Sequence, residues 1–198
     1  SNSQKIADPF CGSAAVSWFL AENTDKTVIS GDIQSFAVAR ASSVIERTTA
    51  FDPQPMLTHW FERARETVNA VASHFPNHLR SIEPNLTDPS KIKEVVSQSR
   101  NFCHDVLPVV FCNFEGKWPI SKAYGGYYYS PVQALIFDAL RQTLPKKSQE
   151  KKVALAALVE AVGRAAAAPG HTAQPFQPTE SSAKYIIEAW LRDPWELI

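Results

Sequence analysis

The sequence has no excess of either charge, because 20 lysine and arginine residues are matched by 20 aspartate and glutamate residues. A protein that binds DNA nonspecifically on its own is usually clearly basic, so a nucleic-acid role must rest on a local patch or on a partner. No apolar run approaches the roughly 18 to 20 residues of a membrane span. The polar start also lacks the basic region and apolar core of a targeting peptide.

Cysteine is scarce as well. The odd number of three, Cys11, Cys103 and Cys112, without a secretory signal favours free thiols in a reducing cytoplasm. His74 and His78 have a helical spacing, but Pro76 lies between them and no third metal ligand is nearby. The length of 198 residues and a hydrophobic content of 44% are those of one globular domain, or of one domain with a small appendage. We therefore expect a cytoplasmic globular protein.

What the sequence does contain is an α/β pattern in its first fifty residues. Residues 5–9 and 27–30 are short strand candidates with apolar and β-branched side chains. Between them, residues 14–22 carry apolar side chains at helical spacing, and residues 35–47 repeat that pattern. Asp52-Pro53 then breaks the chain. Residues 1–50 are therefore predicted to form part of a parallel α/β sheet.

From residue 51 onward the pattern is almost entirely helical. Helices are predicted over residues 55–75, from the capping signal Asp88-Pro89 toward residue 102, over 132–144, over 148–168 and over 182–192, with a loop over 169–182. Two strands followed by helices cannot complete a sheet, and natural proteins cover or pair open sheet edges. The missing strands are therefore expected on another chain.

The loop between the first strand and its helix, residues 8–14, suits a nucleotide-type ligand. Asp8 ends the strand, where its carboxylate can reach a cationic amino group, and Phe10 can pack over the same ligand. Gly12 permits close backbone approach and a positive φ. Ser13 and Ala14 begin a helix whose positive end faces the site.

An acidic residue, Asp32, follows the second strand, about 20 positions after the loop. A carboxylate at this place can accept hydrogen bonds from a ribose diol, and Ile33 can lie against an adenine face. The alternative interpretation is a glycine-containing turn of any α/β protein, with Asp32 as a helix cap.

The segment over residues 117–129 interleaves aromatic residues, glycines and two lysines. Aromatic rings with local positive charge suit an unpaired base, and Lys122, Tyr127 and Tyr129 are its candidate contacts. If the segment is extended, Tyr127 and Tyr129 share one face. Packing of the tyrosines against the following helix is the alternative. Lys146 and Lys147 are candidate phosphate contacts or, alternatively, part of a solvated loop.

Both regions resemble the DNA adenine methyltransferases of the Dam-like group. The spacing Asp8-x-Phe10-x-Gly12-x-Ala14 is similar to that family's S-adenosylmethionine loop. The segment from Tyr127 to Arg141 resembles its Tyr-Phe-Ser-x-x-x-Ala line, which begins a helix with an Asp-Ala-x-Arg face. The resemblance covers residues 5–47 and 124–192.

The resemblance implies a partial Rossmann-like methyltransferase sheet in residues 1–50, followed by a mainly helical target-recognition region over residues 51–198. It implies S-adenosylmethionine as cofactor and DNA as partner, with the amino group of a flipped adenine as methyl acceptor. The cofactor-binding residues would then be Asp8, Pro9, Phe10, Gly12, Ser13, Asp32 and Ile33.

The sequence departs from the family pattern at three places, of which the catalytic line is the most serious. Ala14 stands where the family has a second glycine, and the family's glycine- and lysine-containing segment before the first strand is missing. The Asp-Pro-Pro-Tyr line is absent, since none of the four Asp-Pro pairs is followed by a second proline: Asp8-Pro9, Asp52-Pro53, Asp88-Pro89 and Asp193-Pro194.

Three functions follow from this pattern. The first is one half of a split methyltransferase, with a second chain carrying Asp-Pro-Pro-Tyr. The second is a degenerate, non-catalytic methylase that binds DNA or a partner. The third, an unrelated nucleotide-dependent oxidoreductase, is disfavoured because the third-glycine spacing of dinucleotide binders is absent.

Overall fold

The computed structural model describes residues 3–47, 49–75, 86, 88–170 and 174–198 and has a mixed α/β fold. The chain divides into two compact units. Unit 1 comprises residues 1–58 and 144–159, and unit 2 comprises residues 59–143 and 160–198. The helical region expected from residue 51 onward thus contributes to both units. Within the described ranges, no helix has the length and hydropathy needed to cross a membrane.

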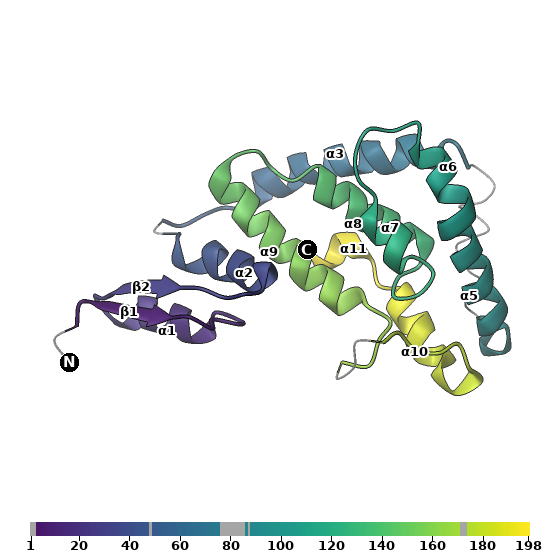
Figure 1. The fold of residues 1–198 in the computed structure, drawn as a ribbon. Helices are drawn as coiled ribbons and strands as arrows, with labels where there is room; N and C mark the ends of the chain where they lie inside the picture. Colours follow the sequence, from purple (N-terminus) through teal and green to yellow (C-terminus); the bar gives the residue numbers. More distant parts are fainter. Residues whose placement is uncertain (1–2, 48, 76–85, 87, 171–173) are drawn as a thin grey trace. The chain divides into compact units, whose positions relative to one another are not determined.

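Unit 1 begins with a β-α-β-α segment (Figure 1). Strands β1 (Lys5–Asp8) and β2 (Thr27–Ser30) pair in parallel, and helix α1 (Ala15–Asn23) connects them. Helix α2 (Ser35–Ile45) follows β2 and packs against α1. The predicted strands and helices of this segment are confirmed, with ends that shift by one or two residues.

The two faces of this small sheet carry different kinds of side chain. Asp8 and Ser30 are opposite one another in the strand register, and both turn toward α1, where they join the buried hydroxyl of Ser17. Because side chains alternate along a strand, Ala7 and Ile29 lie on the opposite face, where Ile29 is 53% exposed. The hydrophobic core of the segment consists of small residues only: Cys11, Ala14, Ala37 and Ala41.

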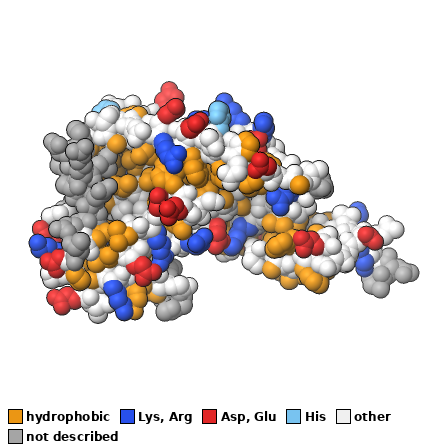
Figure 2. Space-filling view, turned by 180° about the vertical axis from the view of Figure 1, so that it is seen from behind, with side chains coloured by type: hydrophobic (Ala, Val, Ile, Leu, Met, Phe, Trp, Pro, Cys, Tyr) orange, Lys and Arg blue, Asp and Glu red, His pale blue; other side chains and the backbone are white. Residues whose placement is uncertain are grey.

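Large apolar side chains lie on the surface of the same segment. Figure 2 shows hydrophobic surface over it, at the right of that view. The exposed fractions run from 39% for Val38 to 94% for Ile33, and the other members of this set are Phe10, Val16, Trp18, Phe19, Ile29 and Phe36. Single exposed apolar residues are ordinary, but a group of this size within about thirty residues indicates an interaction surface.

Unit 1 also contains the first turns of two long helices, α3 (Gln54–Ala72) and α9 (Ser148–Ala165). An ion pair between Lys152 and Glu46 connects α9 to the residue that follows α2. Hydrogen bonding from Lys152 lowers the pKa of Glu46 below its usual range.

Unit 2 is helical. Besides most of α3 and the end of α9, it contains η1 (Pro89–Lys91), α5 (Ile92–Asn101), η2 (Phe102–Val106, a π-helical turn), α6 (Leu107–Phe111), α7 (Pro119–Tyr124), α8 (Pro131–Gln142), α10 (Glu180–Trp190) and α11 (Pro194–Leu197). The long predicted helices are confirmed, although α8 ends two residues before Leu144 and α9 ends three residues before residue 168. Part of the predicted loop, residues 171–173, lies outside the described residues.

Helix α8 is at the centre of unit 2. Its start is the predicted Ser130-Pro131, and Ser130 and Gln133 form a reciprocal capping box. Nearly every residue from Pro131 to Leu140 is buried. The indole of Trp60 on α3 donates a hydrogen bond to the carbonyl oxygen of Leu140, at 2.9 Å, and so fixes α3 against α8.

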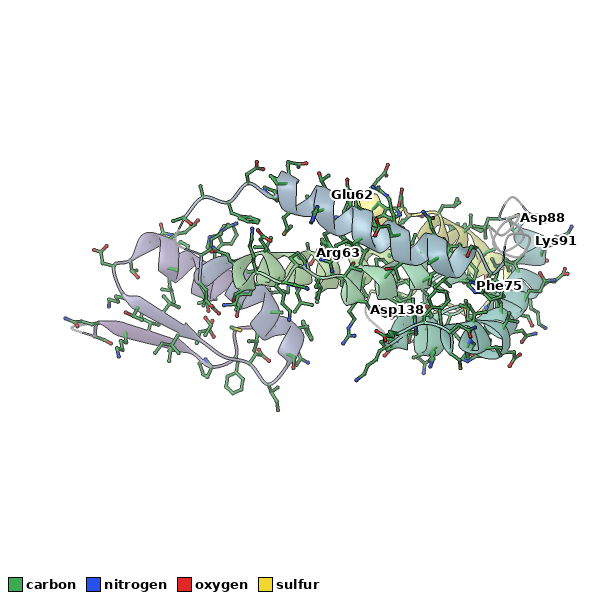
Figure 3. All side chains as sticks on the ribbon, turned by 90° about the horizontal axis from the view of Figure 1, so that it is seen from above. Glu62, Arg63, Phe75, Asp88, Lys91 and Asp138 are labelled. Carbon is green, nitrogen blue, oxygen red and sulfur yellow. The ribbon has the colours of Figure 1, made fainter. Side chains whose placement is uncertain are left out.

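Asp138 is a fully buried carboxylate on α8 (Figure 3). Its two oxygens accept hydrogen bonds from the backbone amides of Ile120 and Ser121, at 3.0 and 2.7 Å. These amides lie in the first turn of α7, which has no partner for them within the helix. Burial raises the pKa of Asp138 above its ordinary value, and the hydrogen bonds from Ser121 and Ile120 oppose that rise.

We expect Asp138→Asn to lower the free energy of unfolding by about 2 kcal/mol, because one of the two amides loses its acceptor. Since the native pKa is raised, the native state binds the proton more tightly than the unfolded chain does. The stability that this proton contributes is present below pH 4 and is lost as the pH rises through the native pKa. The difference in the free energy of unfolding between wild type and Asp138→Asn should therefore shrink as the pH rises from 4. Urea unfolding measures this difference. If this difference does not change with pH, the pKa of Asp138 is not raised in the native state.

Candidate functional site

The candidate ligand loop lies where β1 and β2 end. The backbone pairing continues past the strands, since the amide of Gly31 donates to the carbonyl of Asp8 at 2.9 Å and the amide of Cys11 donates to the carbonyl of Gly31 at 3.0 Å. The chain then turns sharply, with positive φ angles of 49° at Gly12 and 63° at Ala14. For alanine this left-handed conformation costs about 1 to 2 kcal/mol, whereas glycine adopts it freely.

Asp32 fixes the loop from the neighbouring strand. Its carboxylate accepts hydrogen bonds from the amide of Gly12 at 3.0 Å and from the amide of Gln34 at 2.9 Å. The bonds from Gln34 and Gly12 lower the pKa of Asp32, so the group stays ionised at neutral pH. Each carboxylate oxygen can accept a second hydrogen bond. The arrangement therefore leaves acceptor positions for a ligand hydroxyl.

Asp8 has a partner that the sequence did not indicate. The hydroxyl of Ser17 on α1 donates to Asp8 Oδ2 at 2.7 Å, and the hydroxyl of Ser30 donates to Ser17 Oγ at 2.6 Å. One oxygen of Asp8 thus belongs to the contact between the sheet and α1. The structure places Asp8 and Gly12 where β1 ends and Asp32 just after β2, at the same end of the two strands.

The apolar residues of the loop face solvent. Phe10 is 83% exposed and Ile33 is 94% exposed, and both Pro9 and Ser13 are exposed as well. Cys11, between them, is buried in the small core. Burial, followed by the charges of Asp32 and Asp8, raises the pKa of the Cys11 thiol, which therefore stays protonated and packs as an apolar group. The loop presents apolar surface beside a carboxylate.

The candidate DNA contacts are divided between the two units. Lys146 and Lys147 belong to unit 1, where both are exposed and Lys147 forms an ion pair with Glu150 at 2.9 Å. Lys122 belongs to unit 2 and is exposed on α7. Lys146 and Lys147 are thus solvated, and Lys147 is paired with an acidic residue in the first turn of α9.

Tyr127 lies between two side chains that the sequence did not connect with it. The guanidinium of Arg100 lies 3.7 Å from the centre of its ring, and the imidazole of His104 meets the ring edge-on at 5.8 Å. The close approach of two glycines, Gly125 and Gly126, to α5 and η2 makes this arrangement possible. A mid-helix π-turn such as η2 frequently marks a functional site.

Tyr129 is buried, and its hydroxyl donates to the carbonyl oxygen of Val162 at 3.0 Å. Its ring packs edge-on against Phe137, and burial raises the pKa of Tyr129 to about 12. The segment is not extended, because residues 125–129 close a turn in which Gly126 donates to the carbonyl of Tyr129. Tyr129 therefore packs against the following helix, as the alternative interpretation expects. The rings of Tyr127 and Tyr129 do not share an exposed face.

Across the residues that the structure describes, no group of three or more His, Cys, Asp or Glu side chains could hold a metal ion. His78 lies outside those residues, and His74 packs edge-on against Phe114. Cys103 is fully buried, and burial raises its pKa to about 12.

Comparison with known proteins returns no relative: no family model, no curated protein and no solved structure matches this chain.

Proposed function

We propose that this chain is one part of an S-adenosylmethionine-dependent DNA adenine methyltransferase, in which it binds the methyl donor and contributes to DNA recognition. The observation that carries the proposal is the contact between Gly12 and Asp32. It joins a left-handed glycine turn to a carboxylate at the carboxyl ends of two adjacent parallel strands. Open α/β sheets bind their ligands at such strand ends, which supports a Rossmann-like sheet here.

The side chains around the loop match the chemical groups of S-adenosylmethionine, the proposed methyl donor. The open acceptor positions of Asp32 suit the ribose hydroxyls, and the exposed side chains of Phe10 and Ile33 suit the faces of an adenine ring. The Asp8 oxygen that does not bond Ser17 suits the amino group of the methionine part. When bound, S-adenosylmethionine supplies the methyl group.

A second chain is proposed to supply the Asp-Pro-Pro-Tyr line and further strands. Parallel sheets are normally covered on both faces and rarely consist of two strands. The described part of this sheet has only β1 and β2, and the surrounding surface is apolar. In the resulting enzyme the aspartate and a carbonyl of that line would hold the flipped adenine amino group in line with the methyl group.

The experiment combines this chain with a chain that carries Asp-Pro-Pro-Tyr and measures transfer of a labelled methyl group to DNA. We expect transfer from the pair, no transfer from either chain alone, and none from a pair that contains Asp32→Ala. If the assembled pair transfers no label to any adenine-containing duplex, the proposed function is wrong.

The apolar surface of α1 gives a second test. Replacing Trp18 and Phe19 by glutamine should change the free energy of unfolding by less than about 0.5 kcal/mol, because both side chains are at least half exposed. Association with the second chain should weaken at least about tenfold, since a buried aromatic side chain contributes about 1.5 to 3 kcal/mol. Val109→Gln, at a 68% exposed position of unit 2, is the control. Equal affinities for the three proteins would refute the role of this surface.

One observation favours a second function, a degenerate methylase without cofactor. Ala14 is held in the left-handed conformation that the family's glycine adopts more easily, and its methyl group is buried in the loop. A chain that bound DNA but neither S-adenosylmethionine nor NADH would have this function. NADH binding would instead favour the oxidoreductase.

A further inference from the structure

Unit 2 contains an aromatic pocket at the end of α9. Its volume is about 510 Å³. One wall consists of Tyr124 on α7 and of Tyr128 and Tyr129 in the turn that follows. The other wall consists mainly of small residues, above all Gly163, Ala166 and Ala168. A pocket lined by aromatic rings and small side chains suits a planar ring.

Hydrogen bonds hold the two walls together. The hydroxyl of Tyr129 donates to the carbonyl of Val162, and the amide of Ala167 donates to the carbonyl of Tyr128 at 2.8 Å. Tyr124 meets Tyr128 edge-on, with 5.5 Å between ring centres, and is 48% exposed. The pocket is therefore formed before any ligand arrives, and its outer tyrosine is accessible.

A second pocket, of about 500 Å³, adjoins the first and shares Gly163, Ala166 and Ala168 with it. Its charged lining residues are Arg164 and Arg192. Arg192 donates to the carbonyl oxygen of Arg164 and pairs with Glu188 at 3.0 Å. Among the residues that the structure describes, Arg164 forms no ion pair. The second pocket is therefore cationic where the first is aromatic.

We propose that the two pockets together bind one nucleotide of an unpaired DNA strand, with the base against the tyrosines and the phosphate at the arginines. This inference rests on the proposed DNA partner. Bases of single strands stack on aromatic side chains, and guanidinium groups are the preferred partners of phosphate oxygens. An apolar ligand would make no use of the two arginines.

Gly163 offers a variant that fills the pocket without disturbing the fold. It lies within α9, and a Cβ placed on it meets nothing within 4 Å. Leucine is also a much better helix former than glycine. Gly163→Leu should therefore fold at least as well as wild type while its side chain occupies the space shared by both pockets. Tyr124→Ala removes the outer ring, and Tyr124→Phe is its matched control.

The experiment measures fluorescence anisotropy of a labelled twelve-residue oligodeoxyadenylate and of an abasic strand of equal length. We expect the adenine strand to bind more tightly, and Gly163→Leu and Tyr124→Ala to weaken it by roughly 5- to 150-fold, while Tyr124→Phe binds as wild type. Arg164→Gln should lower the slope of log affinity against log salt by about 0.7.

Two results would overturn the inference: equal binding of the abasic strand, or undiminished binding by Gly163→Leu. Displacement of the strand by oligoproline would also overturn it, because aromatic grooves bind such peptides. S-adenosylmethionine binding is measured on the same variants. If the protein binds S-adenosylmethionine but not the strand, this inference alone is wrong. If it binds the strand but not S-adenosylmethionine, the proposed cofactor site is wrong.

Discussion

Replacing Gly126 with alanine is expected to lower the free energy of unfolding by about 3 kcal/mol. A Cβ at this position would lie 2.6 Å from the amide nitrogen of Arg100 and 2.8 Å from the carbonyl carbon of Ser99, both backbone atoms of α5. Overpacking of this kind typically costs about 1 to 3 kcal/mol. The φ angle of 73° adds the left-handed strain of alanine, about 1 to 2 kcal/mol.

The matched control is Gly163→Ala, which places a methyl group in open space on a helix. That substitution should raise the free energy of unfolding by up to about 1 kcal/mol. Urea unfolding followed by circular dichroism measures both proteins. If Gly126→Ala were as stable as wild type, the turn that positions Tyr127 beside Arg100 would not have the described geometry.

Asp32→Ala is expected to have the largest effect on cofactor binding. The substitution removes the acceptor proposed for the ribose hydroxyls and also releases the amide of Gly12, which loosens the loop. Loss of hydrogen bonds to a charged group should weaken binding of S-adenosylmethionine by about tenfold or more. Isothermal titration calorimetry measures the change.

Asp25→Ala is the control, because Asp25 is an exposed aspartate of the same unit outside the loop. It should bind the cofactor as wild type does. Because hydrogen bonding lowers the pKa of Asp32, the carboxylate stays charged until the pH falls below about 4. Cofactor affinity should therefore be constant above pH 5 and should fall as the pH drops toward the native pKa. Equal affinities of the two variants would refute the role of Asp32.

The β-α-β-α segment could be predicted from the sequence because its signals are local. Short segments with apolar and β-branched residues, a glycine turn and helical spacing follow one another within residues 5–47, and each element forms where these signals occur. The contact of Asp32 with Gly12 follows from the same logic, since parallel neighbouring strands end at the same edge. The hydrogen bonds from Ser17 and Ser30 could not be predicted, because they depend on how α1 packs on the sheet.

In unit 2 the short helices could not be predicted from the sequence. Helices α6, α7 and α11 have four to six residues each, too few for a hydrophobic period to show. The burial of Asp138 is explained by its partners in α7, which the sequence pattern of α8 does not reveal. The two pockets at the end of α9 combine segments more than twenty residues apart, so no local sequence pattern predicts them.

The most direct test of the account is ultraviolet crosslinking of labelled S-adenosylmethionine to the chain, followed by tryptic mapping. We expect label in the peptides that cover residues 6–26 or 27–40, and its loss on addition of S-adenosylhomocysteine. These peptides contain the whole loop and Asp32. Label confined to peptides of unit 2, or no specific label, would contradict the assignment of this loop as the methyl-donor site.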